Sequence, residues 1–281
     1  MDSLVTAYIS YLKKPLTTNE ELQSFKKTSF TLYQSLFPDR EINKIIKKNT
    51  NLIIFPDGDL QSIAFESLVV KNNTTKYFIE THDIHYAYSM SYLIENSNMK
   101  RNATIDYVGY APVSFSYENL NILPNTLEEV TKIKDKIGGK SYVQELATKQ
   151  SFFKNSTSSK IIHLATHSNE IENPWIGFKN NKLFLHELYT YKNQAELVYL
   201  NSCNSSLGEI KSGEGVYSLA RGFFYSGANS VISSLWNVND KSTQEITTSF
   251  YKYLKKGNSK SQALRHAKLE YLNTHSLSEV S

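Results

Sequence analysis

Two residues that can do nucleophilic chemistry, Cys203 and His167, each follow a run of apolar residues. Cys203 is the only cysteine of the 281-residue chain and closes the run 195–203, and His167 directly follows the run 161–166. Both runs are continuous rather than alternating in hydrophobicity, which is typical of parallel strands buried on both faces. Because the ligand crevices of open α/β sheets lie outside the carboxyl ends of such strands, we expect the thiol and the imidazole to meet there.

This pair of side chains matches what a cysteine nucleophile requires. A free thiol is mostly protonated at neutral pH, and an imidazole within hydrogen-bond reach raises the thiolate fraction and later protonates the leaving amine. His163 lies inside its apolar run, where we expect a buried, hydrogen-bonded histidine instead. The alternative for Cys203 is a buried, inert thiol, because free cysteine is among the most buried residue types.

The rest of the chain predicts the α/β elements that would position this pair. Residues 3–49 have helical spacing that Pro15 and Pro38 interrupt. Thr126 is expected to cap a helix that Gly138-Gly139 ends, and an exposed loop, mobile before activation, is expected over 204–213. Further strands are expected at 52–55, 105–110 and 229–236, short strands or helical turns at 63–70, 77–79 and 84–88, and helices over 126–136, 148–154, 214–225, 240–256 and 259–273.

Composition excludes several classes of protein. The net charge is +4 and the pI about 8.8, but the lysines occur in scattered pairs without the interleaved aromatic residues of a nucleic-acid groove. A single cysteine rules out an intramolecular disulfide, and no Cys/His cluster has the spacing of metal ligands. No apolar run is long enough to span a bilayer, and the chain starts without the features of a secretory signal, so a cytoplasmic protein without nucleic-acid, membrane or metal partners is expected.

Several blocks of sequence together resemble the CHAT domain, a caspase-like family of cysteine peptidases related to separases. The catalytic half of that family is resembled by blocks at 161–167, 200–203, 213–223, 227–231 and 235–240. The non-catalytic half is resembled by 52–60 with 64–68 and by 123–124 with 128–130. Five blocks in the family's order are far more specific than any single one, and the resemblance covers nearly the whole chain.

The resemblance implies a caspase-like three-layer α/β sandwich, with a mostly parallel central sheet flanked by helices. It also implies a helical lead-in over 1–49, a non-catalytic half over 50–150 and a catalytic half over 151–281. Carried over residue by residue, it makes Cys203 the nucleophile and His167 the general base. The backbone N–H groups of Ser168 and Cys203 are the implied oxyanion-hole donors, although the family usually has glycine where this chain has Ser168.

Three further residues are candidates for substrate binding. Asp240 precedes a predicted helix, so it either caps that helix or lines a pocket for a basic side chain, as a matching acidic residue does in separases. Glu214 is a weaker pocket candidate, because the helix dipole alone favours glutamate in a first turn. Trp236 either forms an apolar pocket wall or belongs to the core.

The sequence thus predicts a cysteine endopeptidase that cleaves a protein substrate, with a basic residue before the cut and no cofactor. Family members frequently await an activator, so an activating protein or a regulatory repeat domain is an expected partner. One alternative is a catalytically silent scaffold that signals through protein binding, which the unusual Ser168 favours. Another is a different thiol enzyme, such as an acyltransferase or transamidase, that uses the same dyad.

Overall fold

The structure is a computed structural model that describes residues 2–73, 75–169, 173–202, 214–235 and 240–275, with only the backbone described at 214–218 and 240. The chain forms two compact units, residues 1–94 with 256–281 and residues 95–255. Helix α4 (Met90–Asn98) spans the first junction between them. The division of the chain after residues 49 and 150 follows the halves of the CHAT domain that the sequence resembles, and these are not the compact units of the structure. That division stays a prediction.

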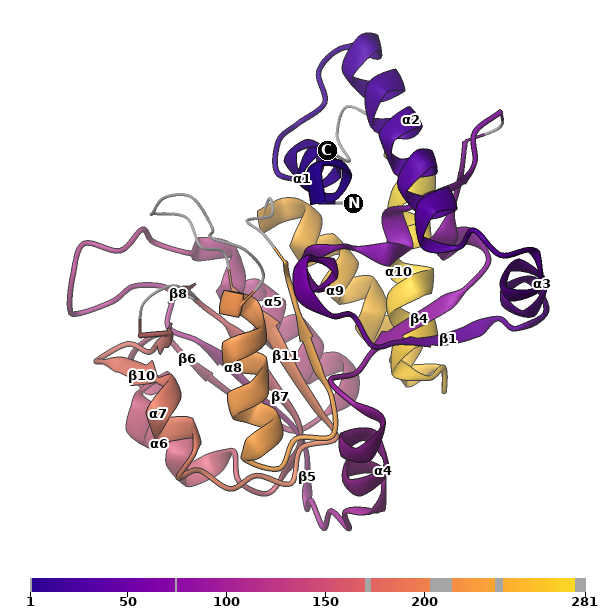
Figure 1. Cartoon of the computed structure of the whole chain (residues 1–281). Coiled ribbons are helices and arrows are strands. Elements are labelled where there is room, and N and C mark those ends of the chain that lie inside the picture. The colour runs from indigo at the N-terminus through magenta and orange to yellow at the C-terminus, as the bar shows by residue number, and fades with distance from the viewer. Residues whose placement is uncertain (1, 74, 170–172, 203–213, 236–239, 276–281) are drawn as a thin grey trace. The chain divides into compact units, whose positions relative to one another are not determined.

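A five-stranded parallel sheet is the centre of the unit formed by residues 95–255 (Figure 1). Its strands stand in the order β12-β11-β7-β5-β6. Their bounds are Ile105–Ala111 (β5), Lys140–Val143 (β6), Ser159–Ala165 (β7), Leu197–Asn201 (β11) and Val231–Ser233 (β12). Relative to the chain, the strand order reverses between β5 and β7, and open α/β sheets bind their ligands at such a switch point.

Helices cover both faces of this sheet, so the predicted three-layer α/β sandwich is confirmed. Alternate strand residues face opposite ways: Ile162 and Leu164 pack with Phe223 in the core of one face. On the other face, the Tyr199 hydroxyl lies 2.9 Å from Thr247 Oγ1. The first face carries α6 (Lys149–Asn155), α7 (Leu185–Leu188) and α8 (Glu214–Tyr225), and the second carries α5 (Pro124–Ile137) and α9 (Asp240–Lys255) (Figure 1).

A small antiparallel sheet follows β7 directly. Strands β8 (Ser168–Asn169), β9 (Trp175–Gly177) and β10 (Lys182–Phe184) pair in the order β10-β9-β8. Trp175 therefore starts a strand. Thr166 Oγ1 donates to Gly177 O at 2.7 Å and fastens this sheet to the end of β7.

The other unit begins with three helices, and the role of residues 1–49 as a lead-in stays a prediction. Its helices α1 (Asp2–Leu12), α2 (Asn19–Leu36) and α3 (Arg40–Lys48) are separated where Pro15 and Pro38 stand. They pack with a parallel pair, β1 (Asn51–Ile54) and β4 (Asp83–Tyr86), and an antiparallel pair, β2 (Val69–Lys71) and β3 (Lys76–Tyr77). This unit also contains the 3-10 turns η1 (Gly58–Ser62), η2 (Phe65–Ser67) and η3 (Phe78–Glu80). A fourth turn, η4 (Gln144–Leu146), belongs to the unit of residues 95–255.

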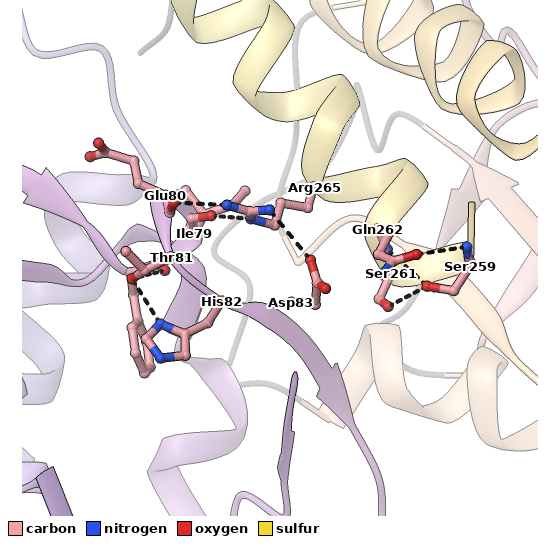
Figure 2. Close-up of polar contacts among 10 residues, drawn as sticks. Ile79, Glu80, Thr81, His82, Asp83, Ser259, Ser261, Gln262 and Arg265 are labelled. Carbon is pink, nitrogen blue, oxygen red and sulfur yellow. Dashed lines mark hydrogen bonds and ion pairs between the residues drawn. The ribbon is translucent and has the colours of Figure 1, made fainter. Parts of the chain in front are cut away.

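Helix α10 (Lys260–Thr274) completes this unit from the far end of the chain. Ser259 caps it, with Gln262 N–H donating to Ser259 Oγ at 3.3 Å and Ser259 N–H to Gln262 Oε1 at 3.2 Å (Figure 2). Arg265 then contacts the turn η3, where it donates to Ile79 O at 2.6 Å and to Glu80 O at 2.7 Å (Figure 2). These charge-assisted bonds link segments more than 180 residues apart in the sequence.

Three local predictions need correction or comment. Helix α5 begins at Pro124, whose missing N–H and fixed φ suit the first helical position, and Thr126 Oγ1 donates to Leu123 O instead of capping. The predicted strand 229–236 is shorter, because only Val231–Ser233 pair with β11. The predicted loop 204–213 lies outside the described residues. Within the described part of the chain, no helix is long and apolar enough to cross a bilayer.

Candidate active site

The ends of β7 and β11 bring the predicted dyad segments together. The two strands run side by side in parallel up to the pair Ala165 and Asn201, and Thr166 N–H donates to Asn201 O at 3.0 Å. Beyond this point Ser168 Oγ donates to Ser202 Oγ at 2.8 Å. The residue after His167 therefore contacts the residue before Cys203. Cys203 itself lies outside the described residues.

His167 is buried, with 4% of its surface exposed, and its ring is oriented by a backbone carbonyl. Its Nε2 atom lies 2.8 Å from Asn121 O. Because a carbonyl oxygen can only accept, Nε2 carries the hydrogen of this bond. In the neutral ring, the basic nitrogen is then Nδ1, which is the atom that could take a proton from a nucleophile.

Asn121 belongs to the segment 112–123, which follows β5 and is held in a bent conformation. Leu123 N–H donates to Val113 O at 2.8 Å, and Val113 has a φ of 66°, a conformation that is uncommon for a β-branched residue. Ser116 N–H donates to Lys179 O at 2.9 Å, which joins the segment to the loop between β9 and β10. The strained backbone thus belongs to the segment that orients the histidine, as is common at functional sites.

Gly177 on β9 lets the same segment pack closely over the histidine. A Cβ at this position would lie 2.9 Å from Phe115 Cε1 and 3.1 Å from the Tyr117 hydroxyl. The Phe115 ring centre lies 5.2 Å from that of His167. The absence of a side chain at Gly177 therefore keeps Phe115 against the imidazole.

Ser168 has the backbone direction that its predicted role requires. It stands opposite Ile176, and Gly177 N–H donates to His167 O at 2.8 Å, so Ser168 and Ile176 form a non-hydrogen-bonded pair. In such a pair the N–H of Ser168 points away from β9. The oxyanion role of Ser168 and Cys203 stays a prediction.

The structure does not describe the side chains of the three predicted pocket residues. Glu214 and Asp240 are the first residues of α8 and α9, and their side chains are not described. Trp236 lies outside the described residues. Their roles in a pocket, and the capping role of Asp240, stay predictions.

The sequence did not predict a buried polar cluster near the ends of β7 and β11, formed by Glu129, Asn201 and His163. Glu129 on α5 is 2% exposed and accepts hydrogen bonds from Asn201 Nδ2 at 2.8 Å to each carboxylate oxygen. His163 is fully buried, with Nδ1 3.0 Å from the Tyr251 hydroxyl, which confirms the structural role expected for it. The signal was available in the sequence, because Glu129 stands beside Val130 and one turn before Ile133 on the apolar stripe of its helix.

Tyrosine hydroxyls line this cluster and remain protonated. Burial raises the pKa of Tyr107, Tyr199 and Tyr251, and the negative charge of Glu129 raises each of them further. These hydroxyls are therefore donors or neutral acceptors and add no charge. No group of three or more His, Cys, Asp and Glu side chains suited to a metal ion occurs among the described residues.

Comparison with known proteins identifies a family and similar solved structures. A family model described as the CHAT domain matches residues 26–279. The structure resembles the crystal structure of the Arg-specific cysteine proteinase gingipain R, with a TM-score of 0.59 and 11% sequence identity. The alignment covers 94% of this chain and 65% of that chain, and at this identity it shows a shared caspase-like fold alone. No curated protein matches the sequence.

Proposed function

Because the chain belongs to the CHAT domain family, we propose that it is a cysteine endopeptidase that cleaves a protein substrate through Cys203 and His167. The family and the fold support the coarser statement that this is a caspase-like cysteine peptidase fold. We propose in addition which residues catalyse the reaction, which class of substrate is cleaved and how the enzyme is activated.

The proposed reaction begins with transfer of the Cys203 proton to Nδ1 of His167. The thiolate attacks the carbonyl carbon of the scissile peptide bond, and the N–H groups of Ser168 and Cys203 stabilise the oxyanion. His167 then gives its proton to the amine as the C–N bond breaks, which leaves a thioester on Cys203. Water, deprotonated by the same imidazole, hydrolyses the thioester and regenerates the thiol.

The observation that carries the proposal is the meeting of the two strand ends. Ser168 and Ser202 are hydrogen-bonded at 2.8 Å, and each is one residue from a member of the dyad. Asn121 O fixes Nε2 of His167, so the ring has the third group that orients the base in a nucleophile–base pair.

We propose further that the residue before the cut is basic and that the enzyme needs an activating protein or a regulatory repeat domain. The solved neighbour is described as Arg-specific, which agrees with an acidic pocket residue, and Asp240 is the candidate. Glu214 and Trp236 would border the same pocket.

The test is cleavage of a mixed-sequence peptide library, with product termini identified by mass spectrometry. Wild type is expected to cut after Arg or Lys, and Cys203→Ala and His167→Ala are expected to lose all cuts. His186→Ala is the control, because this histidine is exposed and lies in the same unit. Cuts that persist in Cys203→Ala would contradict the proposed dyad, and cuts after apolar residues would remove Asp240 from the pocket.

The unusual serine after the histidine favours one alternative, a silent scaffold that acts by protein binding. If no variant cuts, the alkylation rate of Cys203 by iodoacetamide distinguishes the two cases. A latent peptidase keeps a reactive thiolate near neutral pH, whereas a scaffold without a working dyad has the reactivity of an ordinary thiol. Transfer of the acyl group to an added amine, seen as a mass increase at the new C-terminus, would indicate a transferase instead.

A further inference from the structure

The carboxylate of Glu129 lies in a place where a charge is costly. It is 2% exposed, and burial of an unpaired carboxylate costs several kcal/mol unless hydrogen bonds compensate. Asn201 Nδ2 donates to both of its oxygens at 2.8 Å. Nε2 of His163 lies 2.9 Å from Oε1, although its N–H does not point along the line of a hydrogen bond.

Packing alone does not explain this arrangement. Apolar residues of similar volume in place of a buried ionic network are often neutral or stabilising. Val130 on α5 and Ala165 on β7 pack together beside the cluster, so apolar packing is available at this place. A carboxylate at this position therefore calls for a role that a hydrophobic side chain could not fill.

That role is suggested by the second set of bonds that Asn201 makes. Asn201 is the last residue of β11, two residues before Cys203, and its carbonyl accepts Thr166 N–H at 3.0 Å. Thr166 immediately precedes His167. Asn201 thus connects the end of β11, which leads to Cys203, with the end of β7, which leads to His167. Glu129 holds Asn201 through its side-chain amide.

We propose that Glu129 is a positioning residue that sets the spacing of Cys203 and His167 by holding the side-chain amide of Asn201. This inference rests on the proposed function, because it assigns a role within that dyad. Glu129 touches neither reacting group and acts only through the strand end.

The chemistry of the bond provides a variant that restores it. In Glu129→Gln, the amide NH2 takes the place of the carboxylate oxygen Oε2, which now accepts from Asn201 Nδ2, so a donor is left facing a donor. In Asn201→Asp, two carboxylates face each other in a buried site. The double variant Glu129→Gln/Asn201→Asp reverses the bond: Gln Nε2 donates to the aspartate, and Gln Oε1 can accept from His163.

The experiment measures the alkylation of Cys203 by iodoacetamide as a function of pH, together with peptide cleavage. Since this is the only cysteine, the label reports on one thiol. Wild type is expected to show a thiol that titrates below the free value of about 8.5. Each single variant should shift the profile toward that value and lower kcat/KM about 10- to 100-fold, and the double variant should recover most of both.

Asn193→Ala is the matched control. Asn193 is also a buried asparagine with two side-chain hydrogen bonds, to Ser226 Oγ and from Ala195 N–H, but it precedes β11 at the opposite end of the strand. It should lower the melting temperature and leave the alkylation profile unchanged. Should Asn201→Asp fail to fold, Glu129→Gln and the double variant still form the comparison.

The outcomes separate this inference from the proposed function. The inference is overturned if Glu129→Gln lowers stability as Asn193→Ala does while the Cys203 profile keeps the wild-type form. It is also overturned if wild-type Cys203 titrates as an ordinary thiol. If the profile shifts and recovers as expected but the acyl group is transferred to an added amine instead of to water, the positioning role stands and the endopeptidase proposal fails.

Discussion

Replacement of Lys268 by methionine should destabilise the unit formed by residues 1–94 and 256–281 by about 2 kcal/mol at pH 7. Lys268 Nζ on α10 lies 2.6 Å from Glu66 Oε1, and the two side chains are 32% and 21% exposed. Breaking a fully buried pair costs 3–5 kcal/mol and an exposed pair contributes about 0–1 kcal/mol. A pair that is mostly withdrawn from water falls between these limits, and methionine preserves most of the packing of the lysine stem.

The pH dependence of this effect follows from the pKa of Glu66. Burial acts to raise that pKa, but the Lys268 ammonium, its hydrogen bond and the Tyr86 hydroxyl outweigh burial and hold it below the usual value. A depressed carboxyl pKa contributes stability above the unfolded value of about 4.3, and this contribution is lost as the pH falls through the folded pKa. The difference between Lys268→Met and wild type should therefore shrink below about pH 4.

The assay is urea unfolding followed by circular dichroism at several pH values. Both tryptophans, at positions 175 and 236, lie in the other unit, so tryptophan fluorescence would not report on this one. A loss of about 2 kcal/mol corresponds to a midpoint shift of about 1 M urea. Lys44→Met removes an exposed ion pair with Glu41 on α3 and should change stability by about 0.5 kcal/mol or less.

The reasoning fails if Lys268→Met and Lys44→Met have the same small effect at pH 7. It also fails if the cost of Lys268→Met is independent of pH between 7 and 3.5, because the loss would then come from packing rather than from the charge of Glu66.

Two further substitutions test the packing of each unit. Gly177→Ala should lower the free energy of unfolding by about 1–3 kcal/mol and kcat/KM at least tenfold, because the new Cβ would lie 2.9 Å from Phe115, which packs on His167. An unchanged kcat/KM in cleavage assays on the folded variant would contradict this. Ser29→Ala should lower the free energy of unfolding by about 1–3 kcal/mol. The buried N–H of Val69 donates to Ser29 Oγ at 2.8 Å, and the substitution removes this acceptor. An unchanged urea midpoint would refute this prediction.

The elements that the sequence predicted well are those with a strong local signal. The continuous apolar runs before His167 and Cys203 became adjacent parallel strands, as their composition indicated. The helices with clear periodicity and caps, such as α6 after Thr148 and α10 after Ser259, also formed where they were expected. In each case, propensity, capping and amphipathicity favour the same structure.

The features that escaped prediction depend on contacts between distant residues. Strands β8 to β10 have only two or three residues each and are held by tertiary hydrogen bonds, so no local pattern announces them. The acceptor for His167 is the backbone carbonyl of Asn121, and a carbonyl leaves no trace in a sequence. The burial of Glu129 depends on the hydrogen bonds from Asn201, a residue 72 positions further along the chain.

The return of α10 to the N-terminal residues has a consequence for how the chain folds during synthesis. Residues 95–255 can form their complete unit as soon as they have been made, because all of its strands and helices are then available. Residues 1–94 are made earlier, but Glu66, Ile79 and Glu80 have their partners, Lys268 and Arg265, beyond residue 255, so these partners are made only after the other unit. Since domains generally fold as units, residues 1–94 are expected to reach their final structure after residues 95–255, although they are made before them.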